Sequence, residues 1–138
     1  IKNNRHVLLS DYAHHPKEII QSAKSLKEIY PDRKITVIFQ PHLYSRTHDF
    51  YMEFAEALSY FDEVILTEIY PAREKPMPGV TSALIYDNLK SNVEKQMIKK
   101  DDVLQFAKSR DFDVLVVLGA GNLDNYTEQL AEIIKEKE

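Results

Sequence analysis

Short apolar runs alternate with amphipathic helical patterns along the chain, and this alternation constrains the fold more than any other feature. Four such runs lie at residues 7–9, 35–39, 64–67 and 114–118, and a weaker alternating run spans residues 93–98. Nearly continuous apolarity is typical of strands that are covered on both faces of a parallel sheet. The polar character of residues 93–98 instead predicts a strand at the edge of the sheet.

Helical patterns fill the segments between these runs. Pro16 suits the first turn of a helix, because its missing N–H has no partner to lose there. Three helices are expected from apolar residues at helical spacing: Ile19, Ala23, Leu26 and Tyr30 in the first, Phe50, Phe54 and Leu58 in the second, and Leu123, Tyr126, Leu130 and Ile133 in the last. Two more helices are expected from their N-caps: Thr81 or Ser82 would begin a helix to about residue 89, and Asp101 would begin a helix to about residue 109. This β-α order predicts an α/β fold with a mainly parallel sheet of about five or six strands and helices on both faces.

Composition narrows the class of protein. The 138 residues are 43% hydrophobic and 29% charged, as expected for a single globular domain with one core. The absence of cysteine excludes disulfides, thiolate zinc sites and cysteine nucleophiles. A net charge of −4 with no long basic cluster argues against a nucleic-acid partner, and no run is long enough to span a membrane, so we expect a cytoplasmic protein. The first residue is Ile1 rather than methionine, which indicates a piece of a longer protein.

Polar residues follow the first apolar run. Asp11, His14 and His15 are residue types that can bind a metal ion, but adjacent histidines in a turn rarely both reach one ion, so we expect no metal site. Alternatively, Asp11 accepts hydrogen bonds from a ligand hydroxyl and His14 donates to the ligand or titrates near it. A third interpretation is that Asp11 and the histidines only cap the helix that begins at Pro16.

A second polar turn, residues 40–47, follows the second run. Arg46 offers a planar fork that suits a carboxylate or phosphate, and His42, Tyr44 and Ser45 are close in sequence. The alternative is a solvated loop in which Ser45 or Thr47 caps the next helix. Because parallel strands end at one edge of a sheet, and because the two strands can be neighbours, the two turns could form one crevice.

Two other segments indicate a binding site less strongly. Residues 119–122 (GAGN) resemble a phosphate-binding turn but lack the full dinucleotide or P-loop pattern, and a tight strand-to-helix turn explains their glycines equally well. The proline-rich loop at 70–79 is either a plain surface loop or a rigid rim or docking surface. No nucleophile with its base is marked out by spacing.

Four of these segments together carry a family resemblance. In order along nearly the whole chain, they are DYAHHP (11–16), FQPHLYSRT (39–47), EIYPAREKPMPG (68–79) and GAGN (119–122). They closely resemble the C-terminal domain of the Mur ligases, which build the peptide of peptidoglycan. The resemblance implies that residues 1–138 form the third, Rossmann-like domain of a bacterial enzyme. The N-terminal domain of that enzyme would bind a UDP-sugar, and its central domain would carry the P-loop and the magnesium sites.

The resemblance also implies a reaction. ATP, with Mg²⁺ held mainly by the central domain, would phosphorylate the carboxylate of UDP-N-acetylmuramate, and the amine of L-alanine would attack the acyl phosphate. An isolated C-terminal domain would be inactive. A similar recycling ligase that adds an intact tripeptide is one alternative, and a stand-alone nucleotide-binding or docking module is another.

Matched to the family pattern, Asp11 corresponds to an acidic residue at the nucleotide ribose, and Tyr12 and His14 correspond to positions that face the substrates. His42 and Arg46 correspond to residues at the incoming amino acid, where an arginine fork would hold the L-alanine carboxylate.

Two positions depart from the family pattern. Leu43 stands where many relatives carry arginine, and Lys17 or Arg73 could supply the missing cation. Ala13 replaces a common glycine.

Overall fold

The computed structural model describes residues 7–11, 15–109, 112–118 and 127–136 of the chain. Five parallel strands form one sheet in the order β1-β5-β2-β3-β4. The α/β class and the mainly parallel sheet expected from the sequence are therefore confirmed. The elements are β1 (Val7–Asp11), α1 (Pro16–Ile29), β2 (Ile35–Phe39), α2 (Tyr44–Leu58), β3 (Glu63–Leu66), α3 (Ala83–Tyr86), β4 (Glu94–Met97), a 3₁₀ turn (Lys100–Asp102), α4 (Val103–Ser109), β5 (Val114–Leu118) and α5 (Thr127–Glu136).

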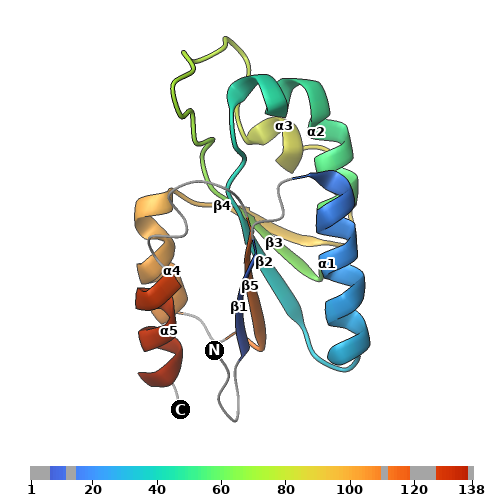
Figure 1. Cartoon of the computed structure of the whole chain (residues 1–138), viewed down its shortest axis with the longest axis vertical. Coiled ribbons are helices and arrows are strands. Elements are labelled where there is room, and N and C mark those ends of the chain that lie inside the picture. Colours follow the sequence, from blue (N-terminus) through green and yellow to red (C-terminus); the bar gives the residue numbers. More distant parts are fainter. Residues whose placement is uncertain (1–6, 12–14, 110–111, 119–126, 137–138) are drawn as a thin grey trace.

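Helices cover both faces of the sheet, with α1, α2 and α3 on one side and α4 and α5 on the other (Figure 1). Strand side chains alternate between the two resulting cores. In β5, Val114, Val116 and Leu118 pack in the core under α1 to α3, whereas Leu115 and Val117 pack in the core under α4 and α5. Successive side chains of a strand point to opposite faces, so burial on both faces requires the continuous apolar run.

The edge strand β4 follows the sequence expectation. All four of its residues are exposed, and it pairs only with β3 among the described strands. Its alternating polar sequence suits an edge position, because charged side chains there oppose pairing with another chain.

Three helix boundaries differ from the sequence expectations. Helix α2 begins at Tyr44, and its buried face includes Thr47 and Phe54, while Phe50 is 40% exposed and does not belong to the core. Helix α3 ends at Tyr86, and the chain continues to Leu89 in tight turns with hydrogen bonds from residue i+3 to residue i.

The third difference concerns Asp101, which lies inside the 3₁₀ turn before α4 and not at the N-cap position of that helix. The last helix buries Leu130 and Ile133 as expected, while Leu123 and Tyr126 lie outside the described residues.

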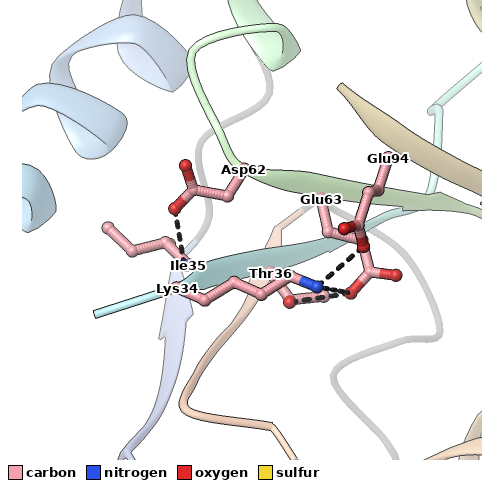
Figure 2. Close-up of polar contacts among 6 residues, drawn as sticks. All are labelled: Lys34, Ile35, Thr36, Asp62, Glu63 and Glu94. Atoms are coloured by element: carbon pink, nitrogen blue, oxygen red, sulfur yellow. Dashed lines mark hydrogen bonds and ion pairs between the residues drawn. The ribbon is translucent and has the colours of Figure 1, made fainter. Parts of the chain in front are cut away.

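A polar network joins the amino ends of the three strands β2, β3 and β4 (Figure 2). Glu63, only 5% exposed, accepts a hydrogen bond from the hydroxyl of buried Thr36 at 3.0 Å. Lys34 places its Nζ 3.7 Å from Glu63 and 2.7 Å from Glu94. Asp62 accepts a hydrogen bond from the N–H of Ile35 at 2.8 Å. These contacts satisfy a buried carboxylate that would otherwise be costly to desolvate.

Candidate functional site

Three adjacent strands end together at one edge of the sheet, which we call the carboxyl edge. Asp11 of β1 and Phe39 of β2 both lie in register with Leu118 of β5. β1 and β2 are not the direct neighbours that the sequence allowed them to be, because β5 lies between them. Two strand spacings therefore separate the ends of β1 and β2 by about 10 Å at the sheet edge. In the sequence, the GAGN segment follows β5 directly, and it lies outside the described residues.

This region also lies where the covering helices change face. The connections after β1 and β2 contain α1 and α2 on one face, whereas the segment after β5 leads to α5 on the other face. Open α/β sheets bind ligands at such switch points, beyond the carboxyl ends of the strands. The topology therefore supports a ligand site at the ends of β1, β5 and β2.

The first polar turn is described only in part. Asp11 ends β1, but its side chain, Tyr12 and His14 lie outside the described residues, so their predicted ligand roles stay predictions. His15 occupies the N-cap position of α1, and its backbone N–H donates to Glu18 Oε1 at 3.2 Å. His15 therefore occupies the capping position that the third interpretation assigned to the histidines.

The second polar turn continues the sheet beyond β2. His42 forms a parallel bridge with Tyr70: the Tyr70 N–H donates to the Pro41 carbonyl, and the Leu43 N–H donates to the Tyr70 carbonyl, each at 2.8 Å. The rings of His42 and Tyr70 stack with centroids 5.6 Å apart and planes 19° apart. The His42 ring is therefore packed against the segment that leaves β3.

Helix α2 begins earlier than in the alternative in which residues 40–47 are a solvated loop and Ser45 or Thr47 caps the helix. Leu43 is the N-cap residue, and Ser45, Arg46 and Thr47 already lie in the first turn of the helix. The Thr47 hydroxyl donates a hydrogen bond at 2.9 Å to the carbonyl of Leu43, four residues earlier in the chain. It therefore does not act as an N-cap, which would accept a hydrogen bond from a backbone N–H. Arg46 is half-buried next to these residues.

Ser45 contacts the proline-rich loop. Glu74 accepts a hydrogen bond from the Ser45 backbone N–H at 3.1 Å and a second, short one from the Ser45 hydroxyl. The hydroxyl bond and then the backbone bond hold the pKa of Glu74 below its ordinary value, against a smaller opposing effect of desolvation. The backbone of Tyr44 and the nearby His42 lower this pKa further. Sequence reasoning gave Glu74 no role, because 29 residues separate it from Ser45.

These contacts favour the rigid-rim interpretation of residues 70–79 over a plain surface loop. The loop extends beyond the sheet next to the beginning of α2 (Figure 1). It turns at Pro71, whose carbonyl accepts the Glu74 N–H at 2.8 Å, and it ends near Gly79, which has a φ of 77°. Glycine suits that position because left-handed backbone carries little penalty without a Cβ.

A separate hollow of about 300 Å³ lies at the carboxyl ends of β3 and β4, away from β1 and β5. Its polar groups are engaged within the chain: the Ser82 hydroxyl donates to the Thr67 carbonyl, and Glu68 accepts the Lys100 N–H at 2.6 Å. The sequence analysis did not single out this hollow. It is lined by Thr67, Glu68, Thr81, Ser82, Ala83, Met97, Ile98 and Lys99.

The geometry defines an α/β domain with polar residues at the carboxyl edge of a parallel sheet, where open α/β sheets bind their ligands. A family model described as Mur ligase, glutamate ligase domain, matches residues 1–121. The chain therefore belongs to the Mur ligase family, and the resemblance noted from its four motifs is confirmed.

Individual relatives agree with this assignment. The chain is 56% identical, over 99% of its length, to a UDP-N-acetylmuramate–L-alanine ligase from Phocaeicola vulgatus, and covers 30% of that protein. Among solved structures it is similar to a UDP-N-acetylmuramate–alanine ligase from Thermotoga maritima, with a TM-score of 0.73 and 29% identity, covering 96% of this chain and 27% of that one. A murein peptide ligase from Psychrobacter arcticus shares the fold, with a TM-score of 0.71 and 17% identity, covering 96% of this chain and 28% of the other.

The chain spans about 30% of the length of the curated relatives that it matches. Within the described ranges, no three histidine, aspartate or glutamate side chains are grouped so that they could hold a metal ion. The same part of the structure contains no helix with both the length and the apolar character needed to cross a membrane.

Proposed function

We propose that this chain is the C-terminal domain of a longer ATP-dependent ligase that joins L-alanine to UDP-N-acetylmuramate in bacterial peptidoglycan synthesis. The observation that carries the proposal is the 56% identity, over 99% of the chain, to a relative of that name. The full-length protein would contain an N-terminal domain for the UDP-sugar and a central domain with the P-loop. It would act in the cytoplasm, where its nucleotide substrates are made.

The reaction would proceed in two steps. The substrate carboxylate attacks the terminal phosphoryl group of ATP, releasing ADP and leaving an acyl phosphate. The uncharged amine of L-alanine then attacks the acyl carbon, and the tetrahedral intermediate expels inorganic phosphate as the amide forms. The roles proposed for this chain are the binding and positioning of substrates.

The match to the family motifs, together with the position of these residues at the carboxyl edge, supports the following residue roles. Arg46, in the first turn of α2, would hold the carboxylate of L-alanine, so that the amine points at the acyl phosphate. His42, fixed against Tyr70, would contact the same substrate. Asp11, at the end of β1, would accept hydrogen bonds from the nucleotide ribose, and Tyr12 and His14 would face the substrates.

The proposal is tested with the full-length protein that contains this chain. Phosphate release from ATP should require UDP-N-acetylmuramate and L-alanine together. Turnover only with the tripeptide would identify a recycling ligase instead. A folded protein that releases no phosphate with either acceptor would contradict ligase activity and leave a binding or docking module.

Arg46→Ala then tests the assigned substrate contact. We expect the KM for L-alanine to rise by about 10- to 100-fold, as for the loss of a hydrogen bond to a charged group, with little change in the KM for the UDP-sugar. Lys27→Ala, an exposed cation in the last turn of α1, is the matched control. Unchanged L-alanine kinetics in Arg46→Ala would contradict the role of Arg46.

A further inference from the structure

The turn between β2 and α2 contains an unfavourable backbone conformation. Leu43 has a φ of 74° and a ψ of 139°, a region that residues with a Cβ rarely adopt. Such conformations persist only where the surrounding structure fixes them, and they are concentrated at functional sites. Leu43 lies directly between His42 and the first turn of α2, so the conformation of this turn determines where both elements lie.

Hydrogen bonds to the backbone of Leu43 hold this turn from two directions. The Leu43 N–H donates to the Tyr70 carbonyl at 2.8 Å, which ties the turn to the segment after β3. The Leu43 carbonyl accepts hydrogen bonds from the Thr47 N–H at 3.2 Å and from the Thr47 hydroxyl at 2.9 Å, which ties the turn to α2.

The third contact comes from a side chain in the proline-rich loop. The Glu74 carboxylate accepts both the Ser45 N–H and the Ser45 hydroxyl. The N-terminal turn of a helix presents unsatisfied N–H groups and a partial positive charge, so a carboxylate is favourable there. Helix α2 has no acidic residue in its own first turn, and Glu74 supplies the negative charge from 29 positions away.

This contact also restricts how the site can bind an anion. A helix N-terminus at the carboxyl edge could itself bind a substrate carboxylate through its N–H groups. Because Glu74 already accepts the Ser45 N–H, a substrate carboxylate would depend on side-chain cations of this region, such as Arg46. The orientation of Arg46 therefore matters more than it would beside an open helix N-terminus.

We propose that Glu74 is a positioning residue of the amino-acid site: its contact with Ser45 fixes the first turn of α2 against the loop and thereby orients His42 and Arg46. This inference rests on the proposed function, because it assigns Glu74 to the binding of the substrate that Arg46 holds. Glu74 acts through its neighbours and touches no reacting atom.

The test uses the full-length ligase and measures phosphate release while ATP, UDP-N-acetylmuramate and the amino acid are varied in turn. Glu74→Ala removes the contact, and Glu74→Gln keeps the shape but loses the charge. Glu53→Gln makes the same change at an exposed glutamate on α2 and is the matched control. We expect the KM for L-alanine to rise by about tenfold or more in Glu74→Ala and by a smaller factor in Glu74→Gln, with the other two KM values within about twofold.

Two further readouts separate positioning from a purely structural role. Loss of folded enzyme lowers kcat per mole of protein but leaves KM unchanged, so a selective rise in one KM is not a stability effect. Ser45→Ala should raise the same KM, and the double variant Ser45→Ala/Glu74→Ala should be no worse than Glu74→Ala, because the second change removes a contact already lost.

Each outcome is assigned in advance. Wild-type enzyme that does not need L-alanine contradicts the proposed function itself; if it uses the tripeptide, the same comparison is made with that acceptor. Active wild-type enzyme together with an amino-acid KM within twofold in Glu74→Ala overturns the positioning role alone. If Glu74→Ala does not fold, Glu74→Gln decides, and a KM equal to that of Glu53→Gln overturns the inference.

Discussion

Replacing Thr36 with valine tests whether the buried carboxylate of Glu63 depends on its hydroxyl partner. Valine has nearly the same shape as threonine, so Thr36→Val removes the 3.0 Å hydrogen bond without opening a cavity. Thr36 and Glu63 are both buried, with exposed fractions of 2% and 5%. Solvent therefore has little access to replace the lost donor.

The expected cost is that of one hydrogen bond to a buried carboxylate. Hydrogen bonds to charged groups contribute about 1.5–3 kcal/mol. Lys34 Nζ stays 3.7 Å from Glu63, but its side chain is 43% exposed, so it compensates only in part. We expect Thr36→Val to lower the free energy of unfolding by about 1–3 kcal/mol, which is about 3–10 °C in Tm for a domain of this size.

Chemical denaturation of the chain, with Glu63→Met as a second background, measures this effect. Methionine fills a similar volume but accepts no strong hydrogen bond, so Thr36→Val should be nearly neutral in that background. A cost below about 0.5 kcal/mol in the wild type, or an equal cost in both backgrounds, would refute the reasoning.

Three other predictions follow. Phe54→Ala should cost about 3–5 kcal/mol in denaturation because Phe54 is 2% exposed, whereas Phe50→Ala should cost less than about 1 kcal/mol; equal losses would contradict the observed face of α2. Asp62→Ala should lower stability by about 1 kcal/mol, since it removes the acceptor of the Ile35 N–H, and an unchanged midpoint would show that water replaces it. The pKa of Glu74 lies below its ordinary value of 4.5, so its contribution to stability is present above pH 4.5 and is lost as the pH falls through the lowered pKa. The difference in stability between wild type and Glu74→Gln should therefore shrink as the pH falls from neutral to below 4.5, and a constant difference would contradict an ionised contact.

Apolar patterning predicted the strands well because burial on both faces leaves a direct record in the sequence. Residues 35–39 and 114–118 are β2 and β5 as expected, and the polar run at 93–98 contains the edge strand β4. Such patterns do not encode which strands pair, so the position of β5 between β1 and β2 could not be predicted.

Local patterning also failed at the beginning of α2. The sequence suggested a polar turn at 40–47 before the helix, or a cap at Ser45 or Thr47, whereas the helix begins at Tyr44 with Leu43 as its N-cap. Leucine is not expected in the left-handed N-cap conformation that Leu43 adopts. The long-range hydrogen bonds of Leu43 with Tyr70 stabilise that conformation, and no local rule includes them.

The sequence by itself determined the α/β class, the alternation of strands and helices, and the family, because apolar periodicity and short motifs are local properties of the chain. It also identified His42 and Arg46 as candidates, since their chemistry is evident from residue type. Only the tertiary structure decided that β5 separates the two polar turns and that Glu74 contacts the beginning of α2. Those contacts join residues far apart in sequence, and their formation depends on the packing of the whole sheet.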